Sequence, residues 1–341
     1  MALAELRAQL EGQNMSTQVA ELFPLNLLGY WADENGQKVS ETFFGDDIYY
    51  YFKGGGNYNL TLNVIVSIES DEHLPNQEEV LLRNLIKVQS DNDKDVCVVK
   101  ITVKDRWELA GNLKNERTAI LKFSCNTLIY GISEHINEIS ISEFKLDNNI
   151  ITSGPKLKST TMLERSEFIQ NVHAVILHRT GSNTVSSALN CASEKAAAHL
   201  YVDKNGDVYQ KISFAQKAPH VGNIRVRPAQ GENPKPSSAQ SHNSEQKKDY
   251  PKRYPYNEDS IGIEVVGMYL SRKNKTPTQT TEYYTSPTDI EQIKSVARLV
   301  NFLTGYFTLN KDEDIYGHEV ISSKCDGEGQ AVHDVIIPYL L

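Results

Sequence analysis

The stretch VHAVILH, residues 172–178, decides the fold of the second half of this chain. An apolar run of this length is typical of a central strand that a sheet buries on both faces. His178 closes the run, and the turn RTGSNT follows it. Because the end of a buried strand is a rigid support for functional side chains, His178 is a candidate metal ligand.

Strands alternate with helices along the rest of this half. Four segments carry the pattern: SSALNCASEKAAAH (186–199), HLYVDKNGDVYQKI (199–212), SIGIEVVGMY (260–269) and SPTDIEQIKSVARLVNFLTGYF (286–307). The first is rich in helix formers, the second has the Asn205-Gly206 turn of a hairpin, and the third reads as a strand. The fourth has a helical apolar period, with Ser286 expected as N-cap and Pro287 in the first turn. This order predicts an α/β domain with a central mixed β-sheet flanked by helices.

The first 155 residues read mainly as β-structure. Turn signals separate four segments rich in β-branched and aromatic residues: IYYYF (48–52), LTLNVIVSI (60–68), VCVVKITV (96–103) and TAILKFSC (118–125). The segment NQEEVLLRNLIKVQ (76–89) is compatible with a helix or with a further strand. Short strands at this spacing predict a mainly-β, sandwich-like domain. A polar stretch with Gly154 and Pro155 marks the expected boundary between a domain at 1–155 and one at 156–341.

Bulk properties disfavour two classes of partner. The 341 residues carry a net charge of −9, which argues against general binding to nucleic acid or anionic membranes, and no segment has the apolar length of a membrane span. Residues 1–18 lack the apolar core of a Sec signal and read as a short amphipathic helix or a frayed arm. The four cysteines are scattered without a CxxC pair, so synthesis in the reducing cytoplasm is expected.

A polar insert follows the predicted hairpin. Residues 224–257 are rich in Pro, Ser, Gln and Lys and have no apolar period, so we expect a long, mobile loop there. Its basic cluster of Lys247, Lys248, Lys252 and Arg253 either is solvated or contacts acidic groups of a substrate. The solvated loop is the favoured interpretation.

The stretch GHEVISSKCDGEG (317–329) collects metal-capable and proton-active side chains near the C-terminus. One interpretation is a polar surface loop. Another is half of a metal site, in which His318 and Asp326 join His178. Three such ligands leave one position open for water, as catalytic zinc sites require.

Two further residues would complete a hydrolytic site. Glu264 lies among apolar strand residues, where a carboxylate is either paired or faces a cleft. Burial there would raise its pKa and suit it to act as a general base. Lys324, two residues before Asp326, would stabilise a developing oxyanion.

Five motifs in a fixed order resemble a known enzyme family. They are HAVILHRT, AAHLYVDKNGDVYQ, APHVGN, NEDSIGIEVVG and GHEVISSKCDGEG. The segment from about residue 170 to 335 thereby resembles the zinc-dependent N-acetylmuramoyl-L-alanine amidases of the amidase-2 family, which is related to peptidoglycan recognition proteins and phage amidase-type lysozymes. The resemblance implies a Zn²⁺ cofactor and leaves the N-terminal β-rich domain unassigned.

The resemblance also implies a role for each matching residue. It gives the metal ligands His178, His318 and Asp326, the catalytic residues Glu264 and Lys324, and the substrate-binding residues His199, His220 and Asn257. The usual aspartate-proline-glycine of the family is Asp326-Gly327-Glu328 here, and Cys325 competes with Asp326 as third ligand because thiolate suits zinc. His199 either faces the cleft or is a packed, hydrogen-bonded residue.

The implied function is hydrolysis of the amide bond between N-acetylmuramic acid and L-alanine, in peptidoglycan or muropeptides, by zinc-activated water. A complete ligand set favours an enzyme over a non-catalytic peptidoglycan-recognition protein, because binding-only relatives commonly lack one ligand. A cytosolic muropeptide-recycling amidase is a further alternative, as is a protein whose main function lies in its N-terminal docking domain.

The expected biological context is export without a Sec signal. The protein would act in the periplasm or cell wall of a target cell, as a phage lysin or as an antibacterial effector, a toxin delivered by an apparatus such as type VI secretion. The N-terminal domain would dock on the secretion apparatus or on the wall. An immunity protein would cover the cleft in the producing cell.

Overall fold

The structure is a computed structural model that describes part of the chain. The described residues are 29–53, 58–71, 77–90, 94–111, 113, 118–127, 135–229, 232–273 and 280–340. The arm or helix expected at 1–18 lies outside these residues. Contacts divide the chain into two compact units, called here the N-terminal unit (Met1–Glu143) and the C-terminal unit (Phe144–Leu341).

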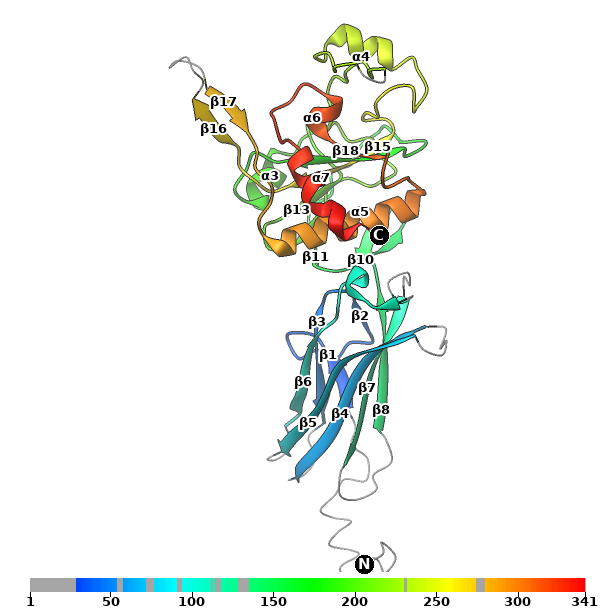
Figure 1. Ribbon diagram of the computed structural model, residues 1–341, viewed down its shortest axis with the longest axis vertical. Helices are drawn as coiled ribbons and strands as arrows, with labels where there is room; N and C mark the ends of the chain where they lie inside the picture. Colours follow the sequence, from blue (N-terminus) through cyan, green and yellow to red (C-terminus); the bar gives the residue numbers. More distant parts are fainter. Residues whose placement is uncertain are drawn as a thin grey trace, which may run out of the picture. The chain divides into compact units, whose positions relative to one another are not determined.

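The N-terminal unit consists of two β-sheets (Figure 1). The three-stranded sheet has the order β1 (Gly29–Ala32), β3 (Asp47–Phe52), β6 (Val96–Thr102), and the five-stranded sheet has the order β2 (Glu41–Phe43), β8 (His135–Ser142), β7 (Thr118–Thr127), β4 (Tyr58–Ser70), β5 (Glu78–Ser90). A 3-10 turn, η1 (Arg106–Glu108), follows β6. The segment at 76–89 is compatible with a helix or a strand from its sequence, and from Glu78 onward it belongs to β5, which pairs with β4 along its length.

Alternation along the strands builds the core of this unit. On β3 every second side chain is buried, namely Ile48, Tyr50 and Phe52. The ring of Tyr50 stacks on Phe123 with 3.8 Å between centroids and meets Trp31 edge-on at 5.0 Å. One hydrophobic core therefore includes residues of both sheets, which confirms the mainly-β, sandwich-like expectation.

The C-terminal unit is built on one six-stranded sheet (Figure 1). Its strand order is β11 (Leu157–Lys158), β14 (Val208–Gln210), β13 (Leu200–Val202), β15 (Ser260–Val265), β12 (Ala174–Arg179), β18 (Ile315–Gly317). The helices are α3 (Val185–Cys191), α4 (Ala239–Glu245), α5 (Ile290–Phe307), α6 (His318–Ile321), α7 (Gln330–Ile336) and the 3-10 turn η3 (Ile337–Tyr339). Two small hairpins complete it, β9 (Lys145–Asp147) with β10 (Ile150–Ser153), and β16 (Leu270–Lys273) with β17 (Thr280–Tyr283).

The sheet is mixed, as predicted. Strands β13, β15, β12 and β18 run parallel to one another. Strand β14 pairs antiparallel with β13 across the predicted hairpin, and β11 pairs parallel with β14. Every residue of β12 is buried, because β12 lies between β15 and β18 and helices α5, α6 and α7 contact it. The expectation of a central mixed β-sheet flanked by helices is confirmed.

Three predicted element boundaries are wrong. Helix α5 begins at Ile290 with Asp289 as N-cap, not at Ser286, because the chain leaving β17 stays extended where the Tyr284 N–H donates to the Asp326 carbonyl at 2.8 Å. Helix α3 ends at Cys191 rather than at 199, since Ser193 and Ala196 exchange backbone hydrogen bonds and form a tight turn. The strand expected at 260–269 ends at Val265.

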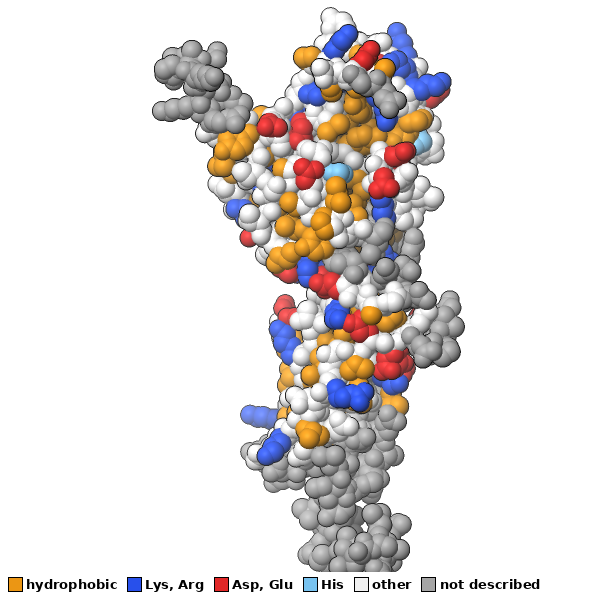
Figure 2. Space-filling view, viewed as in Figure 1, with side chains coloured by type: hydrophobic (Ala, Val, Ile, Leu, Met, Phe, Trp, Pro, Cys, Tyr) orange, Lys and Arg blue, Asp and Glu red, His pale blue; other side chains and the backbone are white. Residues whose placement is uncertain are grey.

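The polar insert at 224–257 is more structured than a mobile loop in its described part. It contains α4, where the Ser238 hydroxyl accepts the Ser241 N–H at 3.0 Å as N-cap. The Tyr250 hydroxyl donates to Asp314. Figure 2 shows Lys and Arg side chains gathered at the α4 end of this unit. Of the basic cluster, Arg253 is buried against Asp259 at 2.7 Å, so only the lysines remain exposed.

No helix among the described residues combines the length and the apolar character that crossing a bilayer requires.

Candidate functional site

The carboxyl ends of neighbouring parallel strands place four side chains in one row. His178 on β12 is the register partner of Glu264 on β15, and Glu264 is also the partner of Tyr201 on β13. On the other side, Leu177 pairs with Gly317 of β18, so that His318 follows directly beside His178. Ligand sites in open α/β sheets form at this edge, because loops leave the strands there.

Two histidines of this row and the carboxylate of Glu328, which lies on the turn before α7, can hold a metal ion. One ligand atom each from His178, His318 and Glu328 lies within 4.8 Å of the others. The rings of His178 and His318 are 4.2 Å apart between centroids, and both side chains are 1% exposed. Nitrogen and carboxylate ligands suit zinc, and three of them leave a coordination position open.

Hydrogen bonds orient the ring of His318 so that Nδ1 faces Glu328. Its Nε2 lies 2.7 Å from the carbonyl oxygen of Val221, which only accepts, so Nε2 carries the proton. Its Nδ1 lies 3.0 Å from Oε1 of Glu328. Metal-binding histidines commonly donate their second N–H to a carbonyl in this way. A cation bound by Nδ1 and Glu328 would take the place of this contact.

A chain of buried hydrogen bonds assigns the tautomer of His178. The Ser260 hydroxyl donates to the Tyr256 carbonyl at 2.6 Å, so its oxygen accepts from Nε2 of His220 at 3.3 Å. Nδ1 of His220 then carries no proton and accepts from Nε2 of His178 at 2.9 Å. Nδ1 of His178 is therefore left with a lone pair that can bind a metal ion.

Burial keeps the imidazoles of His178 and His220 neutral. It lowers the pKa of His178 well below the ordinary value, and the neighbouring His318 and His220 lower it further. Burial, followed by the neighbouring His199, likewise lowers the pKa of His220. A metal ligand must be the neutral imidazole, so this environment suits the binding of a cation.

The side chains of His199 and Asn257, which the sequence predicts to bind substrate, form hydrogen bonds with backbone groups. Nδ1 of His199 accepts the Gly262 N–H at 3.0 Å, and its Nε2 donates to the Gln216 carbonyl at 2.9 Å. The Asn257 side chain accepts the backbone N–H groups of His220 at 3.0 Å and of Val221 at 2.8 Å. These bonds keep His220 against His178 and the Val221 carbonyl against His318.

The position of Gly262 in β15 leaves no room for a side chain. A Cβ at this position would lie 2.6 Å from Nδ1 of His220, the atom that accepts from His178. Any larger residue would push the His220 ring away from its partner. The glycine therefore belongs to the machinery that orients His178.

Glu264 has the environment of a general base. Burial raises its pKa to about 8, the negative charge of Glu328 adds to this, and the positive charge of Lys324 opposes it. Part of the side chain is accessible, yet Oε2 is buried and finds no hydrogen-bond partner among the described residues. A carboxyl group in this state takes up a proton readily near neutral pH.

The structure brings Glu328, rather than the predicted Asp326, to the two histidines. Asp326 is exposed, and its backbone carbonyl binds the Tyr284 N–H. Gly329, with a φ of 107°, turns the chain back toward β12, where a Cβ would lie 2.0 Å from the Leu177 carbonyl. Sequence reasoning missed Glu328, although it stands between two glycines ten residues after His318.

Lys324 and Cys325 lie on the same turn but outside the cluster. Lys324 is exposed, and its charge acts on the pKa values of both Glu264 and His178. Burial and the charge of Glu328 raise the pKa of the Cys325 thiol, which disfavours the thiolate needed for zinc binding.

A family model agrees with these observations. Residues 169–329 match the Amidase_2 model, N-acetylmuramoyl-L-alanine amidase. This confirms, for that segment, the resemblance carried by the five motifs. No match was found among curated proteins.

Solved structures give weaker likenesses. AmiD from E. coli, in complex with the substrate anhydro-N-acetylmuramic acid-L-Ala-D-gamma-Glu-L-Lys, is 15% identical, with 47% of this chain and 52% of that chain covered and a TM-score of 0.31. AmpDH3 from Pseudomonas aeruginosa is 17% identical, with 48% and 57% covered and a TM-score of 0.28. This chain thus spans little more than half the length of each. Since TM-scores this low do not establish a shared fold, the family model is the comparison that matters.

Proposed function

We propose that the C-terminal unit is a zinc-dependent N-acetylmuramoyl-L-alanine amidase that acts on peptidoglycan or muropeptides. One observation carries the proposal: His178, His318 and Glu328 converge beside Glu264 at one edge of the sheet, inside the segment that the family model matches. A metal-ligand set next to a carboxyl group of raised pKa suits hydrolysis of an unactivated amide.

The donor set fits a zinc ion. One imidazole nitrogen each from His178 and His318 and one carboxylate oxygen of Glu328 lie within 4.8 Å of one another. When bound, zinc supplies a Lewis acid that polarises the amide carbonyl and lowers the pKa of a water molecule. Zinc binds neutral imidazole and deprotonated carboxylate, so zinc affinity should rise with pH.

The remaining steps belong to residues of this chain. Glu264 takes a proton from the attacking water and delivers it to the leaving nitrogen of L-alanine. Lys324 lies close enough to shift the pKa of Glu264, and its cation stabilises the negative charge that develops on the carbonyl oxygen. His220 and Ser260 hold the tautomer of His178, and His199 and Asn257 fix the backbone around them. Asp326 and Cys325 remain alternatives for the third ligand.

The biological context stays a prediction. No observation in the structure bears on export, on an effector or lysin role, on delivery by type VI secretion or on an immunity protein. The assignment of residues 1–155 as a docking domain also rests on the sequence. A recognition protein without catalysis is the alternative that the next experiment excludes or establishes.

Release of dye from labelled, insoluble peptidoglycan tests the proposal. The purified chain should release soluble dye, a chelator should abolish the release, and added zinc should restore it. His178→Ala should stay inactive at every zinc concentration. Tight binding to peptidoglycan without release, in protein shown to contain zinc, would identify a recognition module instead.

A further inference from the structure

A cavity lies at the opposite end of β12 from the candidate active site. Its volume is about 560 Å³, within the range of small-molecule sites, and all its lining residues belong to the C-terminal unit. His173, directly before β12, lines it, whereas His178 near the other end of the strand belongs to the metal cluster. Five residues of extended chain separate their Cα atoms by about 16 Å. One sugar ring therefore cannot occupy both places.

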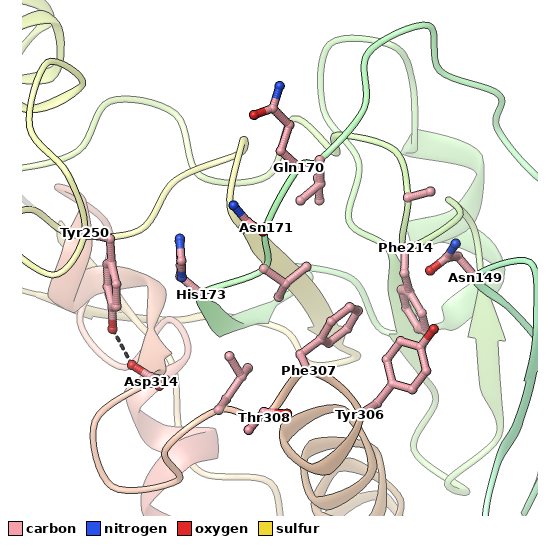
Figure 3. A pocket seen from close by; sticks show the side chains of 14 residues that line it. Asn149, Gln170, Asn171, His173, Phe214, Tyr250, Tyr306, Phe307, Thr308 and Asp314 are labelled. Atoms are coloured by element: carbon pink, nitrogen blue, oxygen red, sulfur yellow. Dashed lines mark hydrogen bonds between the residues drawn. The ribbon is translucent and has the colours of Figure 1, made fainter.

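Aromatic rings form two facing walls of this cavity (Figure 3). On one side Phe214 and Tyr306 flank Phe307, with 6.2 Å and 4.8 Å between ring centroids. On the other side His173 stacks on Tyr250 at 5.1 Å with an interplanar angle of 10°. Tyr306 is 46% exposed although it is a large aromatic residue. One face of its ring stacks on Phe302 with 6.1 Å between centroids, and the exposed part of the ring is available to a ligand.

Polar side chains also line the cavity. The side-chain amides of Asn149 and Asn171 and the imidazole of His173 line the cavity, and none of the three makes a hydrogen bond within the described part of the chain. Convergent donors and acceptors beside aromatic faces are the composition of a site for a ligand with both apolar faces and polar edges.

The charge of the lining selects against anions. No lysine or arginine lines the cavity, and its single carboxylate, Asp314, already accepts from the Tyr250 hydroxyl and from the Asn310 N–H at 2.8 Å. A stem peptide with free carboxylates would meet no counter-charge here. A neutral N-acetylated sugar has hydroxyl and amide groups for Asn149, Asn171 and His173, and ring faces for Tyr306 and Phe307.

We propose that this cavity binds a neutral N-acetylated sugar of the glycan strand, a second contact with the wall polymer away from the scissile amide. The choice of this polymer rests on the proposed amidase function. Two linked contacts raise the affinity for a polymeric substrate above that of either contact alone. The chain should therefore hydrolyse polymeric peptidoglycan more efficiently than a soluble muropeptide, through a lower KM.

Titration of the full chain with tri-N-acetylchitotriose, which contains no peptide, tests this proposal. Isothermal calorimetry should give a Kd of about 1 mM or tighter. Tyr306→Ala and Asn171→Ala should each weaken binding by at least about fivefold, whereas Phe168→Ala, which removes a 63% exposed ring outside the cavity lining, should leave the Kd unchanged.

Each outcome of the titration either supports or overturns the proposed sugar site. Absence of binding up to about 10 mM, or equal binding by all three variants, overturns the proposal. The two proposals fail separately, because the titration involves no amide cleavage. Binding of the oligosaccharide by a protein that releases no stem peptide would contradict only the amidase function, and hydrolysis without oligosaccharide binding would contradict only the sugar site.

Discussion

The two ends of β12 hold histidines in opposite situations. At the carboxyl end, His178 is buried and its Nε2–H donates to His220, so that only the lone pair of Nδ1 remains for a ligand. At the amino end, His173 is half-buried and stacks on Tyr250 without a hydrogen bond in the described residues. The first end is organised in advance around one point, as catalysis requires. The second keeps its polar groups uncommitted, as adaptable recognition allows.

The largest expected effect is the loss of a ligand at the carboxyl end. His178→Ala should lower zinc content to background and kcat/KM by about 1,000-fold or more, since a metal ion contributes several kcal/mol to the transition state. Elemental analysis and a peptidoglycan hydrolysis assay measure the two effects. His333→Ala removes a partly exposed histidine of α7 that is outside the cluster, and it should change neither. Full zinc content in His178→Ala would contradict the site.

Loss of the general base should separate catalysis from metal binding. Glu264→Gln should lower kcat by about 10²–10⁴-fold while zinc content stays at one ion per chain. In the wild-type protein the base is active when deprotonated, so kcat/KM should rise with pH. The rise should level off at or below about 8, because a bound cation favours the carboxylate over the acid. A kcat/KM that falls between pH 5 and 8 would rule out Glu264 as base.

A matched pair of variants identifies the third ligand. Glu328→Gln should weaken zinc binding by at least about tenfold, because it removes a charged ligand, whereas Asp326→Asn should leave zinc binding unchanged because Asp326 is exposed. Competition with a zinc-binding dye gives both Kd values. The reverse result would assign the ligand to Asp326 and require a rearranged 325–329 turn.

Loss of the hydrogen bonds that orient His178, which run from Ser260 through His220, should have a smaller effect. Ser260→Ala removes the hydroxyl that orients His220, and it should weaken zinc binding by about tenfold. Nitrogen chemical shifts of His178 in the metal-free protein should then report a mixture of tautomers instead of the Nε2–H form alone. Ser295→Ala removes an equally buried hydroxyl that bonds to nothing among the described residues, so it is the matched control. Identical shifts in Ser260→Ala and wild type would show that Ser260 does not set the tautomer of His178.

A last effect, on the metal-free protein, is on the pH dependence of stability. The folded pKa of Glu264 is about 8 against an ordinary 4.5, so at pH above about 4.5 its carboxyl ionises in the unfolded chain first. The free energy of unfolding of the metal-free protein should therefore fall, by up to a few kcal/mol, as pH rises from about 5 to 8. Urea titrations should show a weaker fall in Glu264→Gln. Parallel curves for the two proteins would mean that Glu264 is not desolvated.

Local patterns were sufficient for the strands and for three members of the site. The apolar runs of β12 and β15 predict buried strands. The ends of these strands give the positions of His178 and Glu264 and the edge of the sheet at which His318 lies. Propensity left the segment of β5 undecided, because its pairing with β4 is a tertiary contact. The start of α5 was misplaced because Ser286 and Asp289 are both good N-caps, and a bond to Asp326 delayed the helix.

Three features could be found only in the structure: Glu328, the hydrogen bonds from Ser260 through His220 to His178, and the cavity at the amino end of β12. Whether Asp326 or Glu328 reaches the histidines depends on a turn with Gly329 at a φ of 107°, which no periodicity indicates. Ser260 and His220 are 40 residues apart in the chain, and no local pattern joins them. The cavity combines the ends of β12 and α5 with the 224–257 insert, which read from its composition as a solvated loop.

The identity of the cleavage products tests the central claim most directly. Mass spectrometry of peptidoglycan incubated with the zinc-loaded chain should reveal free stem peptides that begin with L-alanine, and glycan whose lactyl groups carry free carboxylates. Chelation and His178→Ala should remove both products. Intact muropeptides after incubation, or cleavage at any other bond, would contradict the proposal that His178, His318, Glu328 and Glu264 form an amidase site.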